Sequence, residues 1–273
     1  MKVRSVIRAE KGNVLVSCDL AQAETWIVAS LANEENMKHA LKFDDIHATT
    51  AKAIFEIPDF YFENRLVGPK EMYKVFKLIT DEQRYSGKRT NHSTSYMMGP
   101  YEFVRRYNEE ADTPIYFSVA KQYQEAWHEL YPGVKGWWTR TEHELLRNNG
   151  TLVTPYGRRI QFFGPINLYI KDAIACVPQS TVADHFRGRE QKHNEIPGGL
   201  RDINKRLPRD ARICQQGHDS ALVECPTGIA MDVVHIMKTC LHRPLIVNGE
   251  EVLIPVDAEI GENWGEMEKV KWT

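Results

Sequence analysis

The alternation of apolar and polar residues predicts where the strands of this chain lie. Residues 13–19 alternate with the two-residue period of a strand, and residues 22–33 then carry the apolar spacing of a helix. Two further apolar runs within residues 211–225 predict a hairpin. Asp19 ends the first strand, and Asp219 lies at the tip of the hairpin. The pattern therefore places two carboxylates at strand ends that are far apart in the sequence.

Helical spacing dominates the sequence between these strands. The predicted helices cover residues 45–55, 70–84, 88–98, 115–130, 134–148 and 167–186, with another at 228–241. The remaining predicted elements are a hairpin over 151–163, an exposed charged loop or small insertion over 188–210, and a strand over 252–260. The pattern predicts an α/β (α+β) fold in which a helical insertion interrupts the sheet.

The amino-acid composition is compatible with a folded enzyme, and it limits the class of protein to which the chain can belong. The chain has 273 residues, of which 42% are hydrophobic, enough for one large domain or two modest ones. Its net charge of −2 gives no general attraction to nucleic acid, so such binding would depend on local basic clusters. The five cysteines lack metal-binding spacing and are predicted to be reduced thiols of a cytoplasmic protein. We find no signal peptide and no apolar run of roughly 18 residues that could span a membrane.

The two strand-end aspartates suggest a cation site. A strand that ends in a carboxylate holds a hard divalent cation rigidly. Two carboxylates on adjacent strands can hold a pair of ions about 4 Å apart, the arrangement used for in-line phosphoryl transfer. Strand-end aspartates are also common as plain turn residues. The segments around Asp19 and Asp219 decide between these readings.

Several segments resemble those of a known family. Residues 19–24, Asp-Leu-Ala-Gln-Ala-Glu, lead into an apolar helix and resemble motif A of the family A DNA polymerases, the bacterial DNA polymerase I type. Residues 218–220, His-Asp-Ser, resemble motif C of that family, His-Asp-Glu. Further segments resemble the family in the same order along the chain, namely residues 45–51, 130–134, 154–159, 178–184 and 261–264. The resemblance covers nearly the whole chain.

This resemblance implies a polymerase architecture and activity. It implies a palm with an antiparallel sheet at residues 1–33 and 166–273, and an inserted helical fingers subdomain at residues 34–165. The implied reaction is template-directed addition of deoxynucleotides to a primer 3′-hydroxyl, with primer–template DNA and dNTPs as partners. Because motif A begins at Asp19, no thumb or exonuclease domain is expected within the chain. The expectation is a fragment or a split, phage-type enzyme whose thumb or 3′–5′ exonuclease is supplied by a separate chain.

The resemblance also assigns residues to the reaction centre. Asp19, Asp219 and the backbone carbonyl of Leu20 would hold two Mg²⁺ ions, for which Mn²⁺ can substitute. Gln22 and Glu24 would contact the dNTP, with Glu24 as a steric gate that crowds the 2′ position of the sugar. A surface helix glutamate is the plainer alternative for Glu24.

The fingers helix of the family carries motif B, R-x3-K-x3-F/Y-G, which meets the triphosphate at every fourth residue. Lys88, His92 and Tyr96 fall on this spacing. Lys88 would bind phosphate as a point charge, and His92 would contact phosphate and donate a proton to pyrophosphate. Tyr96 would lie near the 3′ position of the sugar. Met97 departs from the motif glycine, and a solvated basic helix face remains the alternative reading.

Other residues are expected to contact DNA. By resemblance, Gln179 would read minor-groove acceptors that all base pairs share, and His218 would contact the primer terminus. The candidate phosphate contacts are Arg158, Arg159 and Lys171, for which solvated surface charge is the alternative. The chain departs from the family at Ser220, which replaces the glutamate of motif C, and at Trp26, which replaces an arginine after motif A.

Two other functions are compatible with parts of the sequence. An HD-type metal phosphohydrolase would use His47, His92, His218 and Asp219, but it leaves residues 19–24 and the helix with Gln179 unexplained. A non-catalytic polymerase subunit that binds primer–template would explain the departures from motif B. Template-dependent incorporation of dNTPs distinguishes all three functions.

Overall fold

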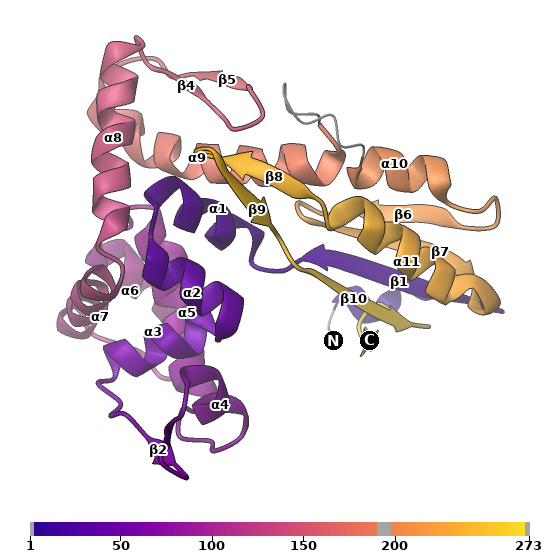
Figure 1. The fold of residues 1–273 in the computed structure, drawn as a ribbon, viewed down its shortest axis with the longest axis horizontal. Coiled ribbons are helices and arrows are strands. Elements are labelled where there is room, and N and C mark those ends of the chain that lie inside the picture. Colours follow the sequence, from indigo (N-terminus) through magenta and orange to yellow (C-terminus); the bar gives the residue numbers. More distant parts are fainter. Residues whose placement is uncertain (1–2, 190–197, 271–273) are drawn as a thin grey trace. The chain divides into compact units, whose positions relative to one another are not determined.

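The computed structural model describes residues 3–189 and 198–270 and divides the chain into two compact units (Figure 1). The sheet unit comprises Met1–Ile27, Val153–Ile160 and Val177–Thr273. The helical unit comprises Val28–Leu152 and Gln161–Cys176. Helices combined with an antiparallel sheet confirm the predicted fold class.

The sheet unit is built on a five-stranded antiparallel sheet with the order β11-β10-β1-β7-β6. The strands are β1 (Asn13–Leu20), β6 (Arg212–Gln216), β7 (Ser220–Pro226), β10 (Val256–Gly261) and β11 (Glu268–Lys269). Strand β1 is central because most of its residues are apolar and buried. Strand β1 has a hydrogen-bonded neighbour on each side, and its last residues lie beside β7 and β10.

One face of this sheet is covered by helix α11 (Ala230–Leu241), which packs on β1, β7 and β10. Apolar side chains such as Val233 and Met237 supply the contact and are fully buried. Because side chains alternate along a strand, the buried Cys18 and the partly exposed Ser17 and Asp19 lie on opposite faces. The face away from α11 is thus the polar one.

Smaller elements complete the sheet unit. They are the 3-10 turns η1 (Val3–Val6) and η2 (Thr227–Ile229), helix α10 (Gly199–Arg206), and the hairpin of β8 (Pro244–Val247) and β9 (Glu250–Leu253). The single strand predicted over 252–260 was wrong, because β9 ends before Pro255 and β10 begins after it. Asn248 and Gly249, both with positive φ, form the hairpin turn before β9. Helix α10 falls in the region predicted as a loop, of which residues 190–197 lie outside the described part of the chain.

The helical unit consists mainly of short helices around aromatic cores. Its helices are α2 (Glu35–Phe43), α3 (Ile46–Ile54), α4 (Pro69–Lys74), α5 (Asp81–Ser95), α6 (Pro100–Asn108), α7 (Phe117–Leu130) and α8 (Gly133–Arg147). The short strands β2 (Tyr61–Phe62) and β3 (Arg65–Leu66) form a hairpin. Trp127 and Tyr131 are completely buried in one of these cores, the Trp127 cluster, which also contains Met37, Val134 and Trp137. The division between the units falls within α1 (Ala23–Ala32) and α9 (Ile166–Arg187), and strands β4 (Thr151–Val153) and β5 (Arg159–Gln161) also span it.

Helix α5 does not match the two helices predicted over 70–84 and 88–98. It begins at a capping box, in which the Thr80 side chain accepts from Gln83 N and the Gln83 side chain accepts from Thr80 N. A Cβ on Gly87 would lie 2.2 Å from the carbonyl oxygen of His47, so this glycine lets α5 pack closely on α3. Capping and close packing therefore fix α5 as one continuous helix across the predicted gap.

Within the described ranges, no helix is long and apolar enough to cross a membrane.

Candidate functional site

The two aspartates singled out by the sequence lie on neighbouring backbone segments. Asp19 is the penultimate residue of β1, and Asp219 lies in the turn between β6 and β7. The backbone nitrogen of Leu20 donates to the backbone oxygen of Asp219 at 3.0 Å. The turn is closed by Gly217 N, which donates to Ser220 O at 2.7 Å. Strand pairing therefore brings together two carboxylates that are 200 positions apart (219 − 19).

The environment of Asp19 opposes its negative charge. Burial, together with repulsion from the neighbouring Asp219 and Asp257, raises the pKa of the Asp19 carboxyl to about 7. A side-chain hydrogen bond that the protonated Asp19 carboxyl donates to Asp219 acts in the same direction. Two carboxylates that repel each other in a partly buried place are stabilised by a cation. Their hard oxygen atoms suit a hard divalent cation such as Mg²⁺.

In the described part of the chain, protein side chains alone do not complete a cation site. Among the residues that the structure describes, no three His, Cys, Asp or Glu side chains are grouped closely enough to hold a metal. Mg²⁺ usually keeps several water ligands and binds through one or two carboxylates plus substrate phosphates. The donor set of Asp19 and Asp219, with Leu20 contributing a backbone carbonyl, fits that mode of binding.

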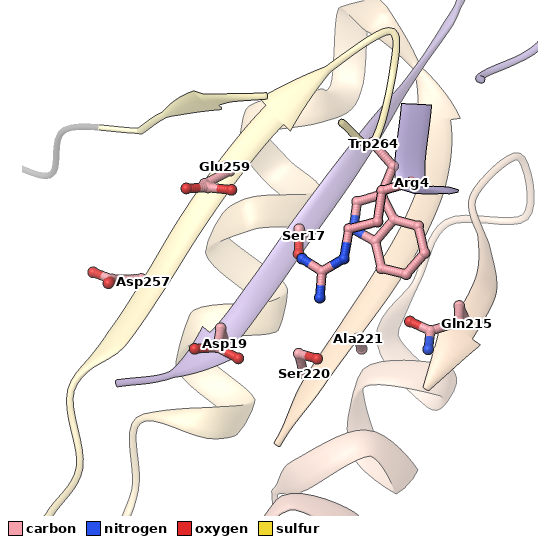
Figure 2. Close-up of a pocket in the computed structure, with 9 residues that line it drawn as sticks. All are labelled: Arg4, Ser17, Asp19, Gln215, Ser220, Ala221, Asp257, Glu259 and Trp264. Carbon is pink, nitrogen blue, oxygen red and sulfur yellow. The ribbon is translucent and has the colours of Figure 1, made fainter. Parts of the chain in front are cut away.

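A cavity of about 330 Å³ lies over the polar face of the sheet (Figure 2). It is lined by Arg4, Ser17, Asp19, Gln215, Ser220, Ala221, Asp257, Glu259 and Trp264. Three of these residues are acidic, and they come from β1 and β10. The guanidinium of Arg4 lies 4.8 Å from the centre of the Trp264 ring, and Figure 2 shows it directed toward Ser17. The Arg4 guanidinium and the Trp264 indole ring thus border the acidic cavity.

Sequence reasoning missed Arg4 because the far end of the chain positions it. The side chain of Asn263 donates to Ser5 O at 2.9 Å, and Trp264 N donates to Ile7 O at 3.1 Å. A Cβ on Gly265 would lie 2.9 Å from Ser5. The segment of residues 261–264 was recognised, but no local pattern indicates that it fastens η1 beside Asp19.

Glu24 and His218, assigned separately from the sequence, face each other. The Nε2 atom of His218 lies 3.4 Å from Oε1 of Glu24, which is in the first turn of α1. Gln22 is exposed and has a φ of 55° in the turn between β1 and α1. The proposed sugar-side glutamate and primer-side histidine therefore belong to one polar group at the end of β1.

The three residues assigned to motif B from the sequence differ in their position along helix α5. Lys88 and His92 are exposed and lie one helical turn apart. Tyr96 is the residue that ends the helix, where it packs against the Trp127 cluster with its ring 5.7 Å from that of His92. Arg84, one turn before Lys88, is inside the helix, and its Nε donates to Asp45 at 3.0 Å. Within α5, the residues that follow one another at intervals of four are therefore Arg84, Lys88 and His92.

The residues expected to contact DNA differ in their exposure and in their partners within the protein. Gln179 and Lys171 on α9 and Arg159 on β5 are exposed. Arg158 instead donates through Nε to Asp184 at 2.9 Å and pairs with it through a second nitrogen as well. Asp184 is only 2% exposed, so Arg158 compensates a buried charge.

Within the described residues, the histidines and aspartates of the phosphohydrolase alternative do not form a metal cluster. Such a site needs several His and Asp ligands around one centre, and no group of three is found in the described part of the chain. His47 lies within the helical unit, with its Nδ1 3.2 Å from the Asn91 side chain. Burial lowers the pKa of His47 to about 4.

A family model and individual relatives both show similarity to DNA polymerases. The family model described as DNA polymerase family A matches residues 1–266. DNA polymerase I of Borreliella burgdorferi is 25% identical over 276 residues, which cover 97% of this chain and 26% of that protein. The thermostable DNA polymerase I of Thermus thermophilus is 25% identical over 274 residues, covering 96% of this chain and 28% of that protein. The chain spans about a quarter of the length of these relatives.

A solved structure shows the same fold. The structure described as the POL domain of Pol1 from M. smegmatis, in complex with DNA primer-template and dNTP, gives a TM-score of 0.72 at 19% identity. The match covers 96% of this chain and 42% of that one. At this identity the likeness concerns the fold alone. Because the family model extends over nearly all residues, the chain belongs to DNA polymerase family A.

Proposed function

We propose that this chain catalyses template-directed DNA synthesis, adding deoxynucleotides to a primer 3′-hydroxyl by a two-metal-ion mechanism. The observation that supports the proposal most directly is the pairing of Asp19 with Asp219 beside an acidic cavity. The sheet unit is proposed to be the palm, and the helical unit the fingers. Primer–template DNA and dNTPs are the proposed substrates, and a separate chain that supplies a thumb or exonuclease stays a prediction.

The proposed cation ligands are Asp19, Asp219 and the Leu20 carbonyl, with Mg²⁺ as the natural ion and Mn²⁺ as a substitute. When bound, the ions supply Lewis-acid activation of the 3′-hydroxyl and charge neutralisation at the triphosphate. The protein's part is to hold two carboxylates on paired backbone segments, so that their oxygens need little rearrangement on binding.

Helix α5 is proposed to bind the triphosphate through its exposed basic stripe. The register expected from the sequence starts at Lys88 and ends at Tyr96, which lies at the helix end. A register one turn earlier keeps Arg84, Lys88 and His92 inside the helix, so we propose this second register. It puts Lys88 at the lysine position of motif B and His92 at the aromatic position. Lys88 then supplies the charge beside the phosphates, and the ring of His92 lies near the sugar.

The contact between Glu24 and His218 suggests how the sugar is read. Glu24 is proposed to crowd the 2′ position, and His218 to hold the carboxylate in place from the turn that also carries Asp219. A positioned carboxylate excludes a 2′-hydroxyl better than a freely rotating one, because the clash cannot be relieved by a rotamer change.

Primer extension tests the proposal. Wild type should extend a primer on a template with dNTPs and Mg²⁺, and Asp19→Asn or Asp219→Asn should abolish extension while the circular dichroism spectrum is kept. Retention of more than about a tenth of the rate, a loss below about 1.4 kcal/mol, would contradict the two-metal assignment. Binding of primer–template by wild type without extension would instead support a non-catalytic subunit.

A further inference from the structure

We propose that Asp257 is the third carboxylate of the candidate cation site, a positioning residue that accepts hydrogen bonds from cation-bound water. The inference rests on the proposed function and extends it to a residue on a different strand. It concerns β10, which the sequence pattern did not connect with either aspartate.

Strand register places Asp257 beside Asp19. On one side, Asp19 is directly opposite Ser220 of β7, and on the other side it is directly opposite Asp257 of β10. Residues directly opposite in an antiparallel pair share a face, with Cβ atoms about 4.5–5.5 Å apart. Ser220 is the position at which motif C of the family has a glutamate. This chain therefore has an acidic residue next to Asp19, but the residue is Asp257 on β10 and not position 220 on β7.

The surroundings of Asp257 leave its carboxylate able to turn. Asp257 lines the same cavity as Asp19, and its side chain is 59% exposed. In Figure 2 the carboxylate points away from Asp19, toward the outer edge of β10. There it lies 3.7 Å from Lys269 Nζ, whose side chain is itself 72% exposed. An exposed pair at this distance holds a side chain only weakly.

This geometry favours a contact through water over direct ligation. Asp257 does not join Asp19 and Asp219 in a group of three ligands within the described residues. Mg²⁺ retains several waters in protein sites, and a nearby carboxylate orients them by accepting their hydrogen bonds.

Glu259 provides a matched control. It lies two residues further along β10 on the same face, lines the same cavity, and is directly opposite Ser17 instead of Asp19. Its Cα is displaced along the strand by roughly 6.7 Å. Glu259→Gln removes the same charge from the same strand without removing the neighbour of Asp19.

The test measures Mn²⁺ binding to the full chain by the electron paramagnetic resonance signal of free Mn²⁺, without nucleotide or DNA. Asp257→Asn should weaken the Asp19-dependent Mn²⁺ affinity about tenfold, as the loss of a group that orients cation ligands does. Glu259→Gln should have a clearly smaller effect. Adding Ser220→Glu to Asp257→Asn should restore affinity, because it returns a carboxylate to the other neighbour of Asp19. Circular dichroism melting confirms that each variant is folded.

The outcomes separate this inference from the proposed function. Unchanged affinity in folded Asp257→Asn, or equal weakening by Glu259→Gln, would overturn the role of Asp257 while leaving the Asp19 site intact. Mn²⁺ binding that is absent in wild type, or unaffected by Asp19→Asn, would remove the cation site itself and both proposals with it.

Discussion

At the scale of single residues, the raised pKa of Asp19 makes stability depend on pH. Its folded value of about 7 exceeds the ordinary value of 3.8, so the folded protein keeps this proton longer than the unfolded chain. The contribution therefore favours folding at low pH and is lost as pH rises from about 4 through 7. Without divalent cations, Asp19→Asn should raise the melting temperature relative to wild type at pH 8 more than at pH 5.

Circular dichroism melting with a chelator measures this difference. A cation replaces the proton as the partner of the carboxylates, so adding Mg²⁺ at pH 8 should stabilise wild type more than Asp19→Asn. An identical difference between the two proteins at both pH values would show that the Asp19 carboxyl is not perturbed by its neighbours.

Glu24 gives a second prediction at this scale. Glu24→Ala should remove the proposed clash with the 2′-hydroxyl and so increase the use of ribonucleotides relative to deoxynucleotides. Because His218 lies 3.4 Å from Glu24 and is proposed to hold it in place, His218→Ala should change this ratio in the same direction by a smaller amount. Single-nucleotide incorporation with rNTP and dNTP gives the ratios. An unchanged ratio in Glu24→Ala would place the steric gate elsewhere.

At the scale of secondary structure, the register proposed for helix α5 determines which ring is expected to contact the sugar. In the register that starts at Arg84, His92→Phe should change the ratio of dideoxynucleotide to deoxynucleotide use, and Tyr96→Phe should not. In the register that starts at Lys88, the loss of the Tyr96 hydroxyl should change it by about ten- to a hundredfold, since one hydrogen bond is worth roughly 1–3 kcal/mol. Incorporation of ddNTP and dNTP by both variants identifies the correct register.

The packing of α5 on α3 can be tested separately. A methyl group at Gly87 would meet the His47 carbonyl oxygen at 2.2 Å, so Gly87→Ala should destabilise the protein by about 1–3 kcal/mol or more. Gly99→Ala is a suitable control, because a Cβ there meets nothing within 4 Å. Equilibrium urea unfolding measures both values, and equal stabilities would mean that α3 moves aside without cost.

Elements with a clear period were predictable, and those defined by tertiary contacts were not. Strand β1 and helices α7, α8 and α11 follow from their apolar spacing. The start of α5 depends on the Thr80 capping box and a close approach to α3, and the strand predicted over 252–260 is divided at Pro255. In the candidate site, the aspartates lie at recognisable strand ends. Arg4 and Asp257 join them only through strand pairing and the contact between η1 and residues 262–264.

At the scale of the whole molecule, the net charge of −2 means that DNA affinity would depend on a few local contacts. Lys171→Ala and Arg159→Ala should each reduce the salt dependence of primer–template binding by about one ion. Arg158→Ala should lower the melting temperature instead, because it removes the shorter of two ion pairs from the buried Asp184 and leaves it the weaker pair with Arg189 at 3.5 Å. Fluorescence anisotropy titrations at several salt concentrations, combined with melting curves, separate the two classes. A salt effect without destabilisation in Arg158→Ala would contradict its structural role.

The fastening of η1 has a consequence for the order in which the protein folds. Ser5 and Asn263, joined by a hydrogen bond, are 258 residues apart, and β1 acquires both neighbouring strands only from the last third of the chain. Contacts between such distant segments slow folding, because a long loop must close before they form. During synthesis, the helical unit can therefore collapse while β1 still lacks its partners. The acidic cavity is completed only after Trp264 has been synthesised, so a nascent polypeptide that ends before this residue lacks the assembled site.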